Sequence, residues 1–309
     1  MSEAQSKLQE PKLSAKRAEV FSLSNDQVYK QWREQKLAGY PGTVEDLKIV
    51  LSNPVELSQQ EKASIAQCLS KTNIALYKCK GPAATKEDIQ ALASQVGLHQ
   101  LDNNLCADED SITSLQVKEN GRHGGYIPYS NKRLSWHTDG YYNPPEQTVR
   151  AIAMHCARPA AAGGENTYLD PEILYIQLRD KNPEWVAALM QPDALTIPPN
   201  VEQGKEIRGE TRGPVFSIDD HGYLHMRYSA RTKNIEWAAN GHIKQATDFI
   251  TAFLASDSPY IFRYRLEENE GVISNNVLHN RTAFEDDDQH KRLLYRARFY
   301  DRALVKQQI

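Results

Sequence analysis

The pattern of apolar and polar positions divides the chain into a helical first part and a strand-rich remainder. Residues 1–20 are polar and lack any periodicity, so we predict a mobile N-terminal arm there. Capping residues then precede runs with apolar side chains at helical spacing, and these predict helices within residues 21–100. The predicted helix starts are Ser24-Asn25, Ser58 and Thr85, and the apolar stripes contain Ile65, Leu69, Ile89, Leu92 and Val96.

From about residue 111 onward, short runs with high β-propensity alternate with Gly, Pro and Asn, which is typical of an all-β core. The predicted strands cover residues 73–80, 111–117, 148–158, 215–218, 223–228, 260–266, 271–278 and 293–300. Helical insertions interrupt them near residues 171–190 and 235–255. The pattern therefore predicts a mainly β fold with flanking helices, as one domain over residues 21–309 with its core at about 111–302.

Charge and composition exclude several classes of protein. The 309 residues include 37 Lys+Arg and 40 Asp+Glu, a net charge of -3, and no basic tract, which excludes a strongly basic nucleic-acid binder. The sequence has neither an apolar run of about 18–20 residues nor an apolar signal segment, so we expect a cytoplasmic protein without a membrane partner. The sequence leaves a homo-oligomer open. Four cysteines without a CxxC pair indicate reduced thiols, namely Cys68, Cys79, Cys106 and Cys156.

Two segments contain side chains suited to metal binding. His137 and Asp139 are two residues apart, so on an extended backbone they project from one face. Far downstream, His279 ends a predicted strand on which Asn275 and Val277 would share its face. Two imidazoles and a carboxylate fill half of an octahedral shell, which suits non-haem Fe(II) with open positions. An H-x-D pair also occurs in turns and structural hydrogen bonds, so the spacing alone leaves a structural role open.

A row of arginines lies on the last predicted strand. Arg292, Arg296 and Arg298 alternate along it and would share one face. Burying such a row is costly unless anions meet it, and a dicarboxylate cosubstrate would supply one through paired hydrogen bonds. Alternatively, the strand lies at a sheet edge, where its arginines face water or pair with nearby acidic residues. Those acidic residues are Glu267, Glu268 and Asp286.

Four motifs in this order resemble the taurine dioxygenase/TfdA family of Fe(II)- and 2-oxoglutarate-dependent oxygenases. They are Trp136-His137-Thr138-Asp139-Gly140, Gly163-Gly164-Glu165-Asn166-Thr167, the segment 276–284 and the segment 292–296. The resemblance spans about residues 73–302, and the first 70 residues lie outside it. It implies a double-stranded β-helix, or jelly roll, with His137, Asp139 and His279 as the iron ligands. Fe(II), 2-oxoglutarate as cosubstrate, and O2 are the implied cofactors.

The resemblance also implies how the cosubstrate is held. Thr167 would hydrogen-bond the C1 carboxylate of 2-oxoglutarate, and Arg292 would grip its distal C5 carboxylate. Asn166 is an extra residue in the family's Gly-Gly-acid-Thr element, so it either displaces Thr167 or shares its role. Arg296 occupies the place of a second arginine near the cosubstrate or near an anionic substrate.

Residues on both sides of the H-x-D motif, and a later glycine-rich segment, are candidates for contact with the substrate. Tyr126, Tyr141 and Tyr142 flank the H-x-D motif and would form an aromatic wall, or else cover an edge of the core. The glycine-rich segment 204–213 would form a lid in which Arg212 meets an anionic substrate, or else an ordinary solvated loop. We predict a dioxygenase that hydroxylates a small molecule with release of succinate and CO2. The alternatives are the same chemistry on a peptide or protein, and a non-catalytic metal-binding jelly-roll protein.

Overall fold

The structure is a computed structural model that describes residues 13–102, 110–117 and 127–304. Its chain contacts separate two compact units. The first unit combines the residues up to Tyr40 with Pro171–Ser258, and the second combines Pro41–Asp170 with the residues from Pro259 onward. The chain thus leaves the second unit at Asp170 and re-enters it at Pro259.

The larger sheet of the second unit contains most of the predicted β core. Its strand order is β1-β2-β16-β5-β19-β3, and every pairing is antiparallel except the parallel pair of β1 and β2. The strands are β1 (Lys48–Leu51), β2 (Ile74–Cys79), β16 (Glu270–Ser274), β5 (Ala151–Arg158), β19 (Leu293–Phe299) and β3 (Thr113–Leu115). Every residue of β16 is buried, because this strand lies inside the sheet and both of its faces are covered.

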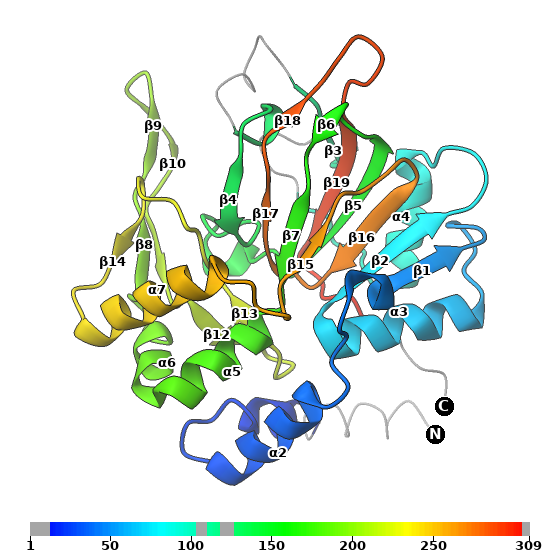
Figure 1. The fold of residues 1–309 in the computed structure, drawn as a ribbon. Coiled ribbons are helices and arrows are strands. Elements are labelled where there is room, and N and C mark those ends of the chain that lie inside the picture. Colours follow the sequence, from blue (N-terminus) through cyan, green and yellow to red (C-terminus); the bar gives the residue numbers. More distant parts are fainter. Residues whose placement is uncertain (1–12, 103–109, 118–126, 305–309) are drawn as a thin grey trace. The chain divides into compact units, whose positions relative to one another are not determined.

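A smaller antiparallel sheet of the same unit has the order β15-β7-β17-β4 (Figure 1). Its strands are β15 (Phe262–Tyr264), β7 (Asn166–Leu169), β17 (Leu278–Arg281) and β4 (Leu134–His137). A two-stranded ladder joins β6 (Ala162–Gly163) to β18 (Phe284–Glu285), and 3-10 turns cover Val44–Leu47, Ile127–Tyr129 and Pro145–Gln147. The fold is therefore a mixed α/β arrangement with several sheets.

Two of the predicted helices pack against the larger sheet, and both begin at the predicted capping residues. They are α3 (Gln59–Thr72) and α4 (Lys86–Gln95), and each begins with a capping box at Ser58 or Thr85. In the first of these, Ser58 Oγ accepts a hydrogen bond from the Glu61 amide at 3.2 Å, which satisfies a donor that the helix leaves open. The apolar stripes of both helices enter one core with β2, and α3 lies against β1 and β2 (Figure 1).

The first unit contains both predicted insertions. The helices are α2 (Asp26–Leu37), α5 (Pro171–Lys181), α6 (Pro183–Leu189) and α7 (Gly241–Leu254). Its sheets are β11 (Thr211–Gly213) with β8 (Leu195–Ile197) and β14 (Glu236–Trp237), β9 (Asn200–Glu202) with β10 (Lys205–Arg208), and β12 (Phe216–Ile218) with β13 (Leu224–Met226). The second insertion becomes helical only at Gly241, because Asn240 caps the helix there.

The N-terminal segment packs against α5 within the first unit. Lys36 forms a buried ion pair with Glu172, and Tyr29 Oη donates to Asp180 at 2.7 Å. Of the predicted N-terminal arm, residues 1–12 lie outside the described residues. The rest departs from the prediction, because residues 13–19 are helical and Arg17 donates to the His221 carbonyl oxygen at 3.0 Å.

The segment predicted as one strand over residues 271–278 is broken in the structure. β16 ends at Ser274 and β17 begins at Leu278, so the chain passes from the larger sheet to the smaller one. Asn276 lies in the left-handed region with φ +51°, which interrupts the alternation of a strand. The prediction that Asn275 shares a strand face with His279 is therefore wrong.

Three described cysteines are free thiols, as predicted, while Cys106 lies outside the described residues. Burial raises the pKa of Cys79 to about 11 and that of Cys156 to about 12. Among the described residues, no helix combines the length and the apolar character that a membrane crossing requires.

We predict that Gly271→Ala destabilises the second unit by about 1–3 kcal/mol, because the new methyl group would overpack a filled interior. A Cβ at Gly271 would lie 2.2 Å from Tyr77 Cζ and 2.4 Å from the Met154 carbonyl oxygen. Urea unfolding followed by fluorescence measures the change. Gly42→Ala is the control, since nothing lies within 4 Å of its Cβ position. Equal midpoints for the two variants would contradict the packing described for β16.

Candidate metal centre

The two predicted histidine ligands face each other across paired strands. His137 ends β4, and the antiparallel register of β4 with β17 sets it opposite His279. The ring centroids lie 4.3 Å apart. Asp139 follows directly after β4, and the candidate ligand atoms of all three residues lie within 4.8 Å of one another. All three side chains are buried. The sequence prediction that they converge is confirmed.

Both histidines are oriented by carbonyl groups of their own backbone segments. His137 Nδ1 lies 2.9 Å from the Ser135 carbonyl oxygen, and His279 Nδ1 lies 2.9 Å from that of Val277. A carbonyl oxygen only accepts, so each Nδ1 carries the proton and donates. The Nε2 atoms are left with their lone pairs free to coordinate a metal, which is the usual arrangement of histidine ligands.

The surroundings of the cluster favour an ionised Asp139 and a neutral His279. Burial alone would raise the pKa of the Asp139 carboxyl group, but the neighbouring Arg296 guanidinium holds it well below its ordinary value. Burial and the neighbouring His137 lower the pKa of His279 to about 4. A carboxylate and a neutral imidazole are the forms that bind metal ions, so coordination at neutral pH displaces no proton from these two groups.

The donor set fits a divalent cation with open coordination positions. Asp139 Oδ2 is buried and accepts no hydrogen bond among the described residues, although Arg296 Nη1 lies 3.2 Å from it. A carboxylate oxygen and two Nε2 atoms at one buried point match the 2-His-1-carboxylate arrangement of non-haem iron sites.

Arg292 is a buried cation without a carboxylate partner. Its exposed fraction is 5%, and among the described residues no carboxylate oxygen lies within 4.0 Å of its guanidinium. The guanidinium lies over the Phe284 ring at 4.9 Å, and only the backbone amide of Arg292 donates to Asp286. The sheet-edge alternative is wrong, because β19 lies between β5 and β3. A buried guanidinium without a carboxylate partner is expected where an anionic ligand binds.

The other two arginines of the row already have partners. Arg296 contacts the Asp139 carboxylate, with Nη1 at 3.2 Å from Oδ2. Arg298 forms a buried ion pair with Asp102 and donates to Tyr142 Oη at 2.9 Å. The row is buried, which agrees with the first of the two alternatives, and its members make different contacts. Asp102 was not identified from the sequence, since it lies far from β19 along the chain.

Thr167 and Asn166 lie on β7, the strand that pairs with the one carrying His279. The register of β7 with β17 sets Thr167 opposite Asn280, one residue beyond His279, and both predicted residues are buried. Asn166 Nδ2 has no hydrogen-bond partner among the described residues. The glycine-rich element also reaches the arginine, since a Cβ on Gly164 would lie 3.5 Å from Arg292 Nε.

The predicted substrate residues differ in burial, and one of them is not among the described residues. Tyr126 lies outside the described residues. Tyr141 is buried, and its ring meets that of Tyr142 edge-on with centroids 5.2 Å apart. Arg212 belongs to the first unit, its side chain is 59% exposed, and it lies 3.6 Å from Glu210. The predicted loop 204–213 is largely formed by β10 and β11.

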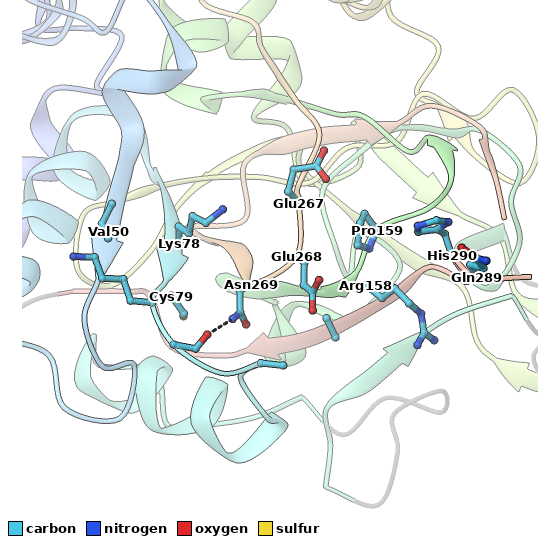
Figure 2. Close-up of a pocket in the computed structure, with 14 residues that line it drawn as sticks. Val50, Lys78, Cys79, Arg158, Pro159, Glu267, Glu268, Asn269, Gln289 and His290 are labelled. Carbon is cyan, nitrogen blue, oxygen red and sulfur yellow. Dashed lines mark hydrogen bonds between the residues drawn. The ribbon is translucent and has the colours of Figure 1, made fainter. Parts of the chain in front are cut away.

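A separate hollow of about 1070 Å³ lies on the second unit and includes none of the predicted site residues. Figure 2 shows Lys78, Arg158 and His290 around it together with Glu267 and Glu268. These side chains carry charges of both signs, and Lys78 already lies 3.6 Å from Glu270. The hollow therefore shares no residue with the metal cluster.

The sequence matches one protein family and is similar to two dioxygenases. Residues 34–298 match the family described as "Taurine catabolism dioxygenase TauD, TfdA family". A uridine-5'-phosphate dioxygenase from an Amycolatopsis species is 29% identical over 195 residues, which are 60% of this chain and 66% of that protein. A second uridine-5'-phosphate dioxygenase, from a Streptomyces species, is 28% identical over 203 residues, 62% of this chain and 71% of that protein.

Solved structures share the fold at low sequence identity. Asparagine oxygenase in complex with Fe(II), 2S,3S-3-hydroxyasparagine and succinate has a TM-score of 0.55 and 15% identity, covering 99% of this chain and 92% of that one. AAD-2 in complex with Mn(II) and N-oxalylglycine has a TM-score of 0.58 and 12% identity, covering 83% and 96%. The family match runs through both units and includes all three candidate ligands. The chain therefore belongs to the TauD/TfdA family of Fe(II)- and 2-oxoglutarate-dependent dioxygenases.

Proposed function

We propose that His137, Asp139 and His279 hold Fe(II), and that the enzyme hydroxylates a small anionic molecule. The observation that carries the proposal is the convergence of two Nε2 atoms and a carboxylate at one buried point. With iron bound, the site supplies O2 activation, in which substrate, 2-oxoglutarate and O2 yield hydroxylated substrate, succinate and CO2. The three side chains would hold the metal and would leave coordination positions open for other ligands.

We propose that Arg292 grips the C5 carboxylate of 2-oxoglutarate. Its burial without a carboxylate partner supports this role, because a bidentate carboxylate would supply both the missing charge and two hydrogen bonds. Thr167 would hydrogen-bond the C1 carboxylate, and the unpartnered Nδ2 of Asn166 offers a further donor beside it. The guanidinium lies 4.9 Å from the centroid of the Phe284 ring.

We propose that Arg296 recognises an anionic group of the substrate. It contacts Asp139 on the second unit, so it borders the metal position. Both curated relatives are named for a phosphate-bearing substrate, which makes a phosphorylated nucleoside the first class to test. Tyr141 and Tyr142 follow the H-x-D motif directly and would line the same side of the site. Arg212 belongs to the first unit, and its role as a substrate contact stays a prediction from the sequence.

We also propose that the two larger sheets of the second unit form a double-stranded β-helix. The passage of the chain from β16 in one sheet to β17 in the other supports this. Both units would belong to one oxygenase domain over residues 21–309, since the family match crosses every boundary between them. The charge balance and composition favour a cytoplasmic location and a small-molecule partner over nucleic acid.

Asp139→Ala is expected to abolish substrate-dependent succinate release, because two imidazoles alone do not fix the metal or its charge. Succinate is measured by mass spectrometry with Fe(II), 2-oxoglutarate and ascorbate present. Asp102→Asn is the control for loss of a buried carboxylate, since Asp102 pairs with Arg298. Full turnover in Asp139→Ala would refute the assignment of the triad.

Arg292→Ala should weaken 2-oxoglutarate binding by about 2–5 kcal/mol, roughly 30-fold to several thousand-fold, because the C5 carboxylate loses a buried charged partner. Iron binding should persist, since the triad is untouched. The dissociation constant is measured anaerobically through the metal-to-ligand charge-transfer absorbance with saturating Fe(II). Arg231→Ala removes an exposed arginine of the first unit and should leave the constant unchanged. An unchanged constant in Arg292→Ala would remove the cosubstrate role from this arginine.

Arg296→Ala should raise the KM for the substrate at least about 10-fold, which corresponds to about 1.4 kcal/mol of lost anion binding. Succinate release is measured over a panel that begins with uridine 5'-phosphate and uridine, so that the contribution of the phosphate is read directly. The 2-oxoglutarate constant should change less than the substrate KM. If the dissociation constant of 2-oxoglutarate rises by a larger factor than the KM of every anionic substrate, Arg296 binds the cosubstrate instead.

A further inference from the structure

We propose that Asn276 is a positioning residue that fixes the backbone of the ligand Asp139 to the strand carrying His279. This inference rests on the proposed iron site, and it concerns a side chain to which the sequence motifs gave no role. Asn276 lies in the short connection between β16 and β17, three residues before His279. Its side chain reaches the opposite segment, the one that follows β4.

The Asn276 amide pairs with both backbone groups of Asp139. Its Oδ1 accepts from the Asp139 amide N–H at 2.8 Å, and its Nδ2 donates to the Asp139 carbonyl oxygen at 2.9 Å. The same Nδ2 donates to the Val149 carbonyl oxygen at 2.6 Å. One side chain therefore joins three segments, and its exposed fraction is only 1%. Hydrogen bonds so well shielded from water are costly to leave unmade.

The neighbouring backbone restricts Asp139 further. Gly140 has φ +69°, and a Cβ there would lie 2.6 Å from Val149 Cγ2, so only glycine lets the two segments approach this closely. Asn276 itself has φ +51°, a conformation that asparagine tolerates better than most residues. The left-handed turn directs its amide toward Asp139, whereas an extended residue there would continue the strand.

These contacts bear on the metal because they set the distance between two of its ligands. Asn276 binds the backbone of Asp139, whose side chain carries the carboxylate ligand. His279, the second ligand, follows Asn276 by three residues. Losing the amide would leave the Asp139 N–H and two carbonyl groups without their partner, and the turn would shift to satisfy them. Outer groups that orient metal ligands typically contribute 10–100-fold to metal affinity.

Asn275 provides a matched comparison. It is also a buried asparagine of the same connection, yet its Oδ1 accepts from the Ala303 amide at 2.9 Å and its Nδ2 donates to Asn73 Oδ1 at 3.3 Å. Neither contact reaches a metal ligand. Substitution of Asn275 therefore reports the general cost of losing a buried amide in this connection.

The test compares Co(II) binding to the full-length wild type, Asn276→Gly, Asn276→Asp and Asn275→Ala, without cosubstrate. Glycine keeps the left-handed backbone and removes the amide, while aspartate keeps one acceptor and loses both donations. We expect both Asn276 variants to bind Co(II) 10–100-fold more weakly, with an altered ligand-field absorption spectrum, and Asn275→Ala to stay within about 2-fold of the wild type. Thermal unfolding of the apo proteins checks the fold of each variant.

Unchanged affinity and spectrum in a folded Asn276 variant would overturn the positioning role while leaving the iron site intact. An equal loss in Asn275→Ala would also overturn it, because the effect would then reflect general destabilisation. Failure of the wild type to bind Co(II) would instead overturn the proposed metal site, and this inference with it. If Asn276→Gly does not fold, the comparison of Asn276→Asp with the wild type decides in the same way.

Discussion

The antiparallel pairing of β4 with β17 is the constraint on which the rest of the site depends. This register sets His137 opposite His279 and lets Asp139, immediately beyond the end of β4, close the third corner of the cluster. A shift of one residue would turn a histidine to the other face of the sheet and remove it from the cluster. The pairing in turn depends on the break between β16 and β17, because that break moves the chain from the larger sheet to the smaller one.

Charge explains why so many polar groups are buried in the second unit. Asp139 is held as a carboxylate by Arg296, and Arg298 is neutralised by Asp102, so these two pairs are balanced within the protein. Arg292 is not balanced, and burial lowers its pKa although the arginine stays a cation. A dianionic cosubstrate that binds both the metal and this guanidinium would restore the balance. Electrostatic balance thus links the metal ligands to the cosubstrate.

The sequence predicted much of this because the relevant signals are local. Helix caps at Ser58 and Thr85 and the H-x-D spacing each depend on residues a few positions apart, and the structure agrees with them. The interruption at Asn276 was missed, because a single left-handed residue inside a β-rich run has no periodic signature. The partner of Arg298 was missed for a different reason, since Asp102 meets β19 only through tertiary packing. The sequence also did not predict that residues 171–258 form a compact unit with the N-terminal segment. Local patterns cannot show this, because the two segments are far apart in the chain.

The most direct test of the account is a crystal structure of the full chain with Mn(II), a redox-inert substitute for Fe(II), and N-oxalylglycine in place of 2-oxoglutarate. Anomalous difference density locates the metal without bias. The account predicts one ion bound by Nε2 of His137, Nε2 of His279 and the Asp139 carboxylate, with the distal carboxylate of the analogue on Arg292. An ion at another place, coordination through an Nδ1 atom, or an analogue whose distal carboxylate avoids Arg292 would contradict it.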